Sequence, residues 1–587
     1  MVYSLKCFPP GTDHKMIVSS PLLPYPKIIK KTPERDYLSR MVPPTYEFHK
    51  RAKYDLENTF HMLVMEADIR TGVAHKNACS RLGAVCYQLG HVLYEIENGL
   101  GVSVLAFEKA LEAIEDHVID PDNVLTAINS LNMLAFLEAN HNKNTERALE
   151  FLDRADSIYK TYRDKEPKMP DPTGVDVLLE DCTEDNRTWE ERSYKRNPMV
   201  NARLYTLFYY IEIYRILKLT EEEIFYSHAA LKHQIDNDIY MQCPLDWVQT
   251  CIQMSEWLLN ANAFQQAKHH MEAASMFLEE VIPKNLSYYN GSQELKQYLA
   301  DVSYSWSRYG MRLLKKSKTR LMKKKTHRLP PSSFNDLLFD KFEEKLGGQD
   351  TPVYVDNFKD AEELTKNIIK WINETKLFYT FDMSNNFYGY LSIDKCQAYK
   401  NLAFFQDNSL ETEKLLKIGV VDMEILVVKL DDLSLRRQMW YELSNMYRFM
   451  MEIQYEQYVL IKKEVPKTGA KLINKYSNTS ISYYLKFIES FTTTIGPSEV
   501  QKKAILLSNL YLAKCYDKQI VYLKQVKIRN LLEGEKYYKR IINYCESDYA
   551  LAAMIPYELS YARNMLKLLP TKIKNLSKLS KTSKCYV

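Results

Sequence analysis

Histidine clusters are the first residues of this chain whose chemistry could make a metal or catalytic site. They are His269-His270 and the pair His228 and His233. Neighbouring residues on a helix point about 100° apart, and a spacing of five suits one helix face poorly, so neither cluster predicts shared metal ligands. We interpret these side chains as ordinary surface or interface histidines, and we assign no metal-binding, catalytic or cofactor-binding residue.

Cysteine and carboxylate groups do not predict a site either. The ten cysteines are scattered without a Cys-x-x-Cys motif, and the closest pairs, Cys79/Cys86 and Cys243/Cys251, have the wrong spacing for zinc. Reduced thiols in helix cores fit a cytoplasmic protein. The carboxylates of Glu221-Glu222-Glu223 open a predicted helix, where they complement the positive end of the helix dipole.

Motifs for nucleotide or hydrolytic chemistry are absent from the sequence. It contains no Gly-x-x-x-x-Gly-Lys-[Ser/Thr], Gly-x-Gly-x-x-Gly, His-Glu-x-x-His or Gly-x-Ser-x-Gly. The tryptophans could stack on bases, but their helical spacing favours packing between repeats; examples are Trp247, Trp257, Trp306 and Trp440. We therefore predict a protein that is not an enzyme and needs no cofactor.

Charge and hydropathy narrow the class further. The 79 basic and 75 acidic residues of this 587-residue chain give a formal net charge of +4, which argues against a dedicated nucleic-acid binder. Residues 1–24 mix charges and prolines and lack the apolar stretch of a secretory signal. No run approaches the roughly 18 apolar residues of a membrane span. We expect a cytoplasmic protein without a membrane span.

The distribution of glycine and proline favours long helices. Glycine is scarce, at 16 residues, and none occurs between Gly174 and Gly291. From 201 to 280 the only proline is Pro244. Strands joined by tight turns need many more of both residues, whereas helices joined by short links need few. The chain is therefore predicted to be all-α.

The helical periodicity recurs at the length of a helix pair and resembles a tetratricopeptide unit. In such a unit small residues let the two helices approach closely, while bulky residues fill the space between neighbouring pairs. Four segments follow the pattern in order: Leu89-Gly90 and Tyr94 with Ser103, Phe107 and Ala110; Ala135-Phe136 with Ala148, Leu152 and Ala155; Ile211 and Tyr214 with Ser227 and Ala230; Met254-Ser255 with Ala267, Met271 and Ala274.

A looser version of the pattern returns in the second half. Leu443-Ser444 with Tyr447, and Leu512-Ala513 with Tyr516, carry the signature of a first helix. Gly534, Tyr538 and Ile541 stand where the second helix should follow the latter. A continuous helix is predicted from Ser292 to about Lys318, and it leads into the break between the halves.

These patterns predict a tetratricopeptide-like right-handed helical solenoid in two halves, joined by a long helix and a linker. The expected parts are an extended or disordered arm over 1–50, an N-terminal solenoid over 51–325, a linker over 326–350, a C-terminal solenoid over 351–570 and a basic frayed tail over 571–587. The oligomeric state is open, and a monomer is favoured.

Two charged segments interrupt the helices. An acidic stretch over 180–191 is predicted to be a long loop between repeats. This loop is either a solvated insertion or a segment that binds a partner. A basic tract over 315–328 could be a nuclear signal or an anion patch, and it is also typical of a solvated face between domains.

A curved stack of helix pairs presents its first helices on a concave side, and this side suits a bound helix or an extended peptide. We therefore expect a protein-binding scaffold. One alternative is a cochaperone that clamps the acidic end of a peptide, which requires Lys, Arg and Asn together on first helices. Lys218 and Lys232 are the candidates for such a clamp.

Several stretches over about 80–575 resemble one family, the kinesin family-binding proteins (KIF-binding proteins). These stretches are Asp171-Pro172-Thr173, Leu231-Lys232-His233-Gln234 running to Tyr240 and Asp246-Trp247, Phe378–Asp382, Leu402-Ala403-Phe404-Phe405, Tyr544-Cys545-Glu546, Glu558-Leu559-Ser560 and Leu568-Leu569-Pro570-Thr571-Lys572. Residues 1–60 look extended, unlike the helical N-terminal region of the family.

The resemblance implies a function that periodicity cannot give. Members of the family bind the motor domains of a subset of kinesins, hold the motor helix that docks on the microtubule and keep the motor off its track. It also implies association with the cytoskeleton and effects on axon growth, neurogenesis and organelle transport.

The resemblance also implies contact residues on the concave face of the third and fourth pairs. Tyr209 and Gln234 look similar to the family types there, whereas Glu212 and Gln253 stand where the family favours Gln and Thr. Tyr209 and Gln234 have an alternative role, which is only to join helices.

Overall fold

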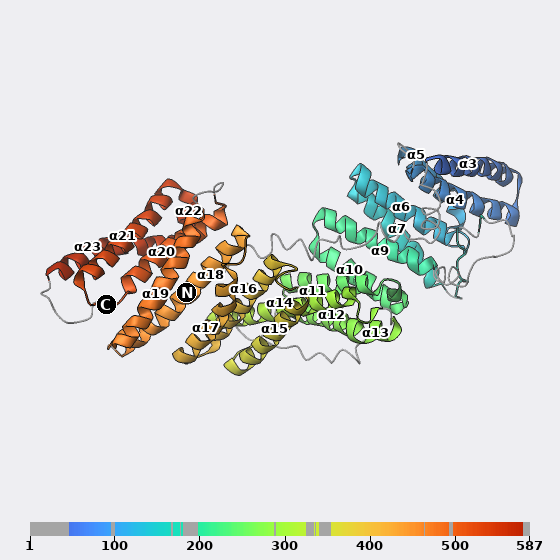
Figure 1. Cartoon of the computed structure of the whole chain (residues 1–587). Helices are drawn as coiled ribbons and strands as arrows, with labels where there is room; N and C mark the ends of the chain where they lie inside the picture. The colour runs from blue at the N-terminus through green and yellow to red at the C-terminus, as the bar shows by residue number, and fades with distance from the viewer. Residues whose placement is uncertain are drawn as a thin grey trace. The chain divides into compact units, whose positions relative to one another are not determined.

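The computed structural model describes residues 46–95, 100–165, 168–175, 178–179, 198–286, 289–323, 334, 336–339, 354–462, 464–491 and 497–578. Every regular element in these ranges is a helix (Figure 1). The all-α prediction is therefore confirmed. The expected arm up to residue 45, the acidic stretch over 180–191, most of the linker and residues 579–587 lie outside the described residues.

The described residues divide into two units. Residues 46–286 and 334–339 form the N-terminal unit, and residues 289–323 and 354–578 form the C-terminal unit. Each unit consists of antiparallel helix pairs packed on their neighbours along the chain.

The N-terminal unit begins with one extra helix and continues with the four predicted pairs. Its helices are α3 (Tyr46–Ile69), α4 (Gly72–Glu95), α5 (Leu100–Ala113), α6 (Val124–Leu137), α7 (Thr145–Arg163), α9 (Pro198–Leu217), α10 (Thr220–Asp236), α11 (Pro244–Asn260), α12 (Phe264–Met276) and the short α13 (Ile282–Asn285). The pairs are α4–α5, α6–α7, α9–α10 and α11–α12, and each coincides with one repeat found in the sequence.

The small residues of the repeat allow close contact within a pair, as predicted. A Cβ atom at Gly90 of α4 would lie 2.7 Å from the ring of Phe107 on α5. The Ser103 hydroxyl donates a hydrogen bond of 2.8 Å to the Gly90 carbonyl. Phe107 is fully buried in the core of the first two pairs.

Helix α3 corrects our expectation of an extended segment up to residue 50, and of extended structure up to residue 60. It begins at Tyr46 and packs against α4. Leu56, Phe60, Leu63 and Ala67 are its inward side chains, spaced four, three and four apart as one helix face requires. The prolines that precede residue 45 hid this pattern.

The C-terminal unit contains the remaining pairs. Its helices are α14 (Gln293–Met322), α15 (Phe358–Phe378), α16 (Asn385–Leu402), α17 (Ser409–Leu426), α18 (Leu433–Tyr455), α19 (Lys467–Glu489), α20 (Glu499–Lys518), α21 (Lys524–Ser547), α22 (Tyr549–Met554) and α23 (Pro556–Lys578). The predicted long helix is α14, and the Ser292 side chain caps its start by accepting the Leu295 N–H at 3.0 Å.

Helix α14 belongs to the C-terminal unit, although our expected boundary at 325 placed it in the N-terminal half. The physical reason is its close packing on α15. A Cβ atom at Gly310 would lie 2.6 Å from Ile368, and the Trp306 and Trp371 rings stack 5.5 Å apart. Packing between helices is thus the role of Trp306.

The described part of the basic tract is helical and only partly solvated. Arg320 is 7% exposed and forms an ion pair with Asp356. Lys318 lies over the Phe404 ring, and burial, followed by the nearby charge of Lys400, lowers its pKa to about 8. The expectation of a solvated face is therefore wrong for these two residues.

Our expectation of a frayed tail is wrong for residues 571–578. Helix α23 continues through Pro570 to Lys578. Lys524 donates a hydrogen bond of 2.7 Å to the Ser577 carbonyl, and Lys572 lies 3.5 Å from Asp517. These contacts hold the last turns of α23 to α20 and α21.

The described part of the linker packs inside the N-terminal unit. Phe339 is 1% exposed, and its ring stacks on His228 with the centroids 4.9 Å apart. Its backbone N–H donates a hydrogen bond of 2.9 Å to Nε2 of His269. Trp247 flanks the same ring at 5.6 Å, so its role is also packing.

The histidines around Phe339 form a buried cluster. Nδ1 of His228 on α10 lies 3.1 Å from Nε2 of His270 on α12. The interface interpretation is confirmed, but a surface position is wrong for both, because they are 4% and 0% exposed. Burial lowers the pKa of His228 to about 3 and lowers the pKa of His270 well below its ordinary value. Both rings are therefore neutral at pH 7.

Substituting Gly90 tests the contact within the first pair. Gly90→Ala should destabilise the protein by about 1–3 kcal/mol, because the added methyl group has no room beside Phe107. The matched control is Gly101→Ala in α5, where a Cβ atom meets nothing within 4 Å. Urea unfolding followed by circular dichroism measures both, and equal midpoints would contradict the packing described here.

The buried histidines predict a loss of stability in mild acid. Their pKa values are lower in the folded chain than in the unfolded chain. The free energy of unfolding is therefore highest above about pH 6.5 and decreases as the pH falls below that value. Each should contribute a slope of about 1.4 kcal/mol per pH unit between pH 6.5 and the folded pKa. Thermal unfolding between pH 7.5 and 5.5 should therefore depend less on pH in a His228→Asn, His270→Asn variant than in the unmodified protein.

A candidate partner-binding face

An aromatic row links the first helices of three successive pairs in the N-terminal unit. The ring of Tyr94 on α4 lies 6.0 Å from Phe136 on α6, and Phe136 lies 5.7 Å from Tyr209 on α9. The Asn132 amide of α6 also donates a hydrogen bond of 3.2 Å to the Ala202 carbonyl of α9. These contacts bring the first helices side by side, as the repeat pattern predicts.

Partly exposed side chains follow the same side of these helices. They recur at spacings of three, four and seven residues, which place them on one stripe of each helix. We call them the first-helix face: Asn129 and Phe136 on α6, Asn140 on the helical turn Glu138–Asn142 that follows it, Tyr205, Glu212 and Ile216 on α9, and Gln249 and Glu256 on α11, with the buried Gln253 between the last two.

Tyr209 lies on the stripe of α9 but is buried. It is 3% exposed, and its hydroxyl contacts the Met133 sulfur at 3.9 Å. Burial, followed by the charge of Glu212, raises the pKa of Tyr209. This placement favours the joining role that the sequence analysis left open. Glu212, one turn further along α9, is half-buried and reaches solvent.

Gln234 is separate from the other predicted residues. It is half-buried on α10, a second helix, so it is not part of the first-helix face. Nε2 of its neighbour His233 donates a hydrogen bond of 2.9 Å to the Val200 carbonyl, which ties α10 to α9. The structure thus places Tyr209 and Glu212 on one stripe and leaves Gln234 on another helix.

Gln253 is the predicted residue with an unsatisfied polar atom. It is 5% exposed on the stripe of α11, and its Oε1 atom has no hydrogen-bond partner among the residues that the structure describes. An unsatisfied buried amide oxygen costs about 1–3 kcal/mol. Because this oxygen is itself inaccessible to solvent, it is not a contact point for a partner.

Sequence reasoning missed the pair Tyr87 and Tyr205. Tyr87 on α4 is half-exposed, yet burial, followed by the nearby Tyr205 of α9, raises its pKa. The two tyrosines therefore lie near each other, on first helices of different pairs. The signal was available for Tyr205, because it stands one helical turn before Tyr209.

The alternative clamp for a peptide carboxylate is not assembled by these helices. Lys218 lies in the turn between α9 and α10 with a positive φ of 59°, and Lys232 lies on the second helix α10. Neither belongs to the first-helix face. In the described ranges no cluster of three or more His, Cys, Asp or Glu residues could hold a metal ion. Nor does any described helix have the length and apolar character for crossing a membrane.

Comparison with known proteins identifies the family. Residues 245–576 match the model described as KIF-1 binding protein C terminal. The KIF-binding protein of Drosophila melanogaster is 23% identical over 530 residues, which cover 85% of this chain and 86% of that protein.

The human relative is similar to this chain to about the same extent. The KIF-binding protein of Homo sapiens is 24% identical over 535 residues, covering 81% of this chain and 83% of its own. Among solved structures, a circular tandem repeat protein aligns with 90% of this chain and 98% of its own at a TM-score of 0.22 and 8% identity. Because the family model matches more than half of its length, this chain belongs to the KIF-binding protein family.

Proposed function

We propose that this protein binds kinesin motor domains through the first-helix face, holds the motor helix that docks on the microtubule and so keeps the motor off its track. The observation that carries the proposal is the stripe of partly exposed polar and aromatic side chains that runs along the first helices of three successive pairs. Relatives along most of the chain are named for binding KIF proteins.

The chemistry of the first-helix face suits a helical partner. Aromatic side chains such as Tyr205 supply rigid contact area with a polar tip, which is common in protein interfaces. Glu212 and Glu256 are carboxylates on neighbouring stripes that can pair with basic side chains of the bound helix.

The proposal describes a binding protein without catalysis of its own. It would act by occupying the motor, and its place would be the cytoplasm near the cytoskeleton. Its effect would reach axonal and organelle transport through the motors that it retains. A monomer suffices, because the proposed face lies within one N-terminal unit.

Microtubule co-sedimentation tests the proposal directly. With increasing amounts of this protein, some kinesin motor domains should move from the microtubule pellet to the supernatant, because the bound helix can no longer dock. The microtubules themselves should pellet unchanged. If no motor in a broad panel leaves the pellet or binds the immobilised protein, the proposal fails.

Substitutions on the first-helix face should weaken motor binding. Glu212→Lys and Glu256→Lys should each reduce affinity about tenfold or more through charge reversal. The matched control is Glu150→Lys, the same charge change at an exposed position of the second helix α7. Calorimetric titration with one motor domain measures all three variants, and an equal loss in the control would locate the interface elsewhere.

A further inference from the structure

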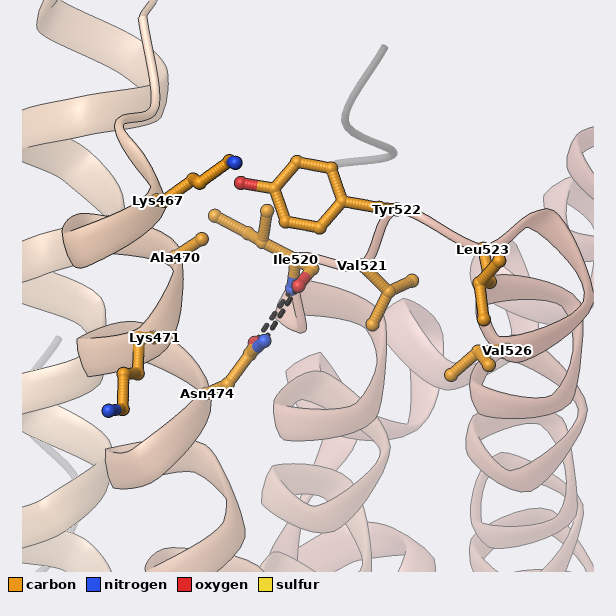
Figure 2. Close-up of a pocket in the computed structure, with 9 residues that line it drawn as sticks. All are labelled: Lys467, Ala470, Lys471, Asn474, Ile520, Val521, Tyr522, Leu523 and Val526. Atoms are coloured by element: carbon orange, nitrogen blue, oxygen red, sulfur yellow. Dashed lines mark hydrogen bonds between the residues drawn. The ribbon is translucent and has the colours of Figure 1, made fainter. Parts of the chain in front are cut away.

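An open groove lies at one edge of the C-terminal unit, apart from the first-helix face. It runs between the first turns of α19 and the connection from α20 to α21, and its volume is about 440 Å³ (Figure 2). Its walls are mostly apolar. The residues that decide its chemistry are Lys467, Lys471, Asn474, Tyr522 and Leu523.

The connection that forms one wall is held rigidly. The Asn474 side chain of α19 donates a hydrogen bond of 2.6 Å to the Ile520 carbonyl and accepts the Ile520 N–H at 2.9 Å (Figure 2). Ile520 itself is 1% exposed. The groove is therefore preformed, and a ligand would not need to order this connection before binding.

Two large apolar side chains follow Ile520 on the same connection and remain exposed. Tyr522 is 45% exposed and Leu523 is 68% exposed. Adjacent exposed apolar residues beside a preformed groove are typical of a binding surface, whereas single exposed ones are not informative.

A row of lysines on α19 lines the groove at Lys467 and Lys471 and continues one turn beyond it. Lys467, Lys471 and Lys475 recur every four residues, all are exposed, and none has an ion-pair partner in the part of the chain that the structure describes. Like charges at this spacing destabilise a helix by a few tenths of a kcal/mol. No carboxylate is among the lining residues. These lysines therefore leave a positive rim that an anionic partner would neutralise.

We propose that this groove binds an acidic, extended peptide segment of a partner protein. One aromatic or aliphatic side chain of the peptide enters between α19 and the side chains of Tyr522 and Leu523. Its carboxylates face the lysine row. A peptide fits better than a nucleic acid or a phosphate, because the floor is apolar and the positive charge lies along one rim only.

Fluorescence anisotropy with the full chain tests this inference. The probe is a short labelled peptide in which glutamates flank one tryptophan, and the comparison peptide has glutamine in place of glutamate. The acidic probe should bind saturably and lose affinity as salt increases, since the lysines are exposed. The glutamine peptide should bind at least tenfold more weakly.

Two variants separate the charged and the apolar parts of the groove. Lys467→Glu with Lys471→Glu should abolish probe binding, whereas Lys366→Glu with Lys370→Glu, an exposed pair of the same spacing on α15, should leave it unchanged. Leu523→Ser should reduce affinity severalfold. Leu523 is the N-cap of α21, where serine is a better residue, so unfolding cannot explain this loss.

The outcomes are decisive in both directions. Equal binding of the two peptides, unchanged binding in the lysine variant, or capture of duplex RNA or anionic vesicles through the same lysines without the peptide would overturn the inference. Release of motors from microtubules should be the same for the lysine variant and the unmodified protein, so failure of this inference and failure of the proposed function are separate results.

Discussion

Close approach of helices at residues with little side-chain bulk is the constraint on which this structure depends. At Gly90 and Gly310 a Cβ atom would lie within 2.6–2.7 Å of a side chain on another helix, and at Gly83 it would lie 2.7 Å from Ile114, just beyond the end of α5. Glycine inside a helix costs about 1 kcal/mol relative to alanine, so these positions are tolerable only because packing offsets that cost. A Cβ atom at Gly534 would lie 3.3 Å from the backbone of α20, so two helices of the C-terminal unit also approach closely at a glycine. Each pair is thereby made narrow enough to stack on the next.

Stacking of pairs also buries polar groups, and in the C-terminal unit these are often charged. Lys400 of α16 and Glu442 of α18 lie 3.0 Å apart and are both nearly inaccessible. Arg448 of α18 pairs with Glu452 at 2.7 Å and lies over the Tyr511 ring of α20. Desolvation cancels much of the attraction in such pairs, so they contribute little net stability. We attribute the register of α16 and α18 to the Lys400–Glu442 pair, because a slip of one turn would leave a buried charge without its partner.

Local patterns in the sequence were sufficient for the fold but not for the sites. Repeat spacing predicted the four N-terminal pairs, and Ser292 marked the start of α14, because both signals come from residues close in sequence. Burial of Gln253 and the contact of His228 with His270 depend on how successive helices pack, and no single-helix pattern contains that information. The groove at Asn474 has the same origin, since its partner Ile520 lies beyond the end of the next helix, α20. The spacing of apolar residues in α3 was present in the sequence, but the prolines before it favoured a prediction of extended structure.

The two surfaces discussed here differ in charge, although the whole chain is nearly balanced. The first-helix face contains two glutamates and no lysine or arginine, whereas the rim of the C-terminal groove contains lysines and no carboxylate. The net charge of +4 is a sum over the whole chain, so it does not reveal that one surface is acidic and the other basic. Complementary charge selects partners and repels wrong ones, so a basic helix and an acidic peptide would each be directed to its own surface. Because the surfaces lie on different units with no shared side chains, substitutions in one should act independently of substitutions in the other.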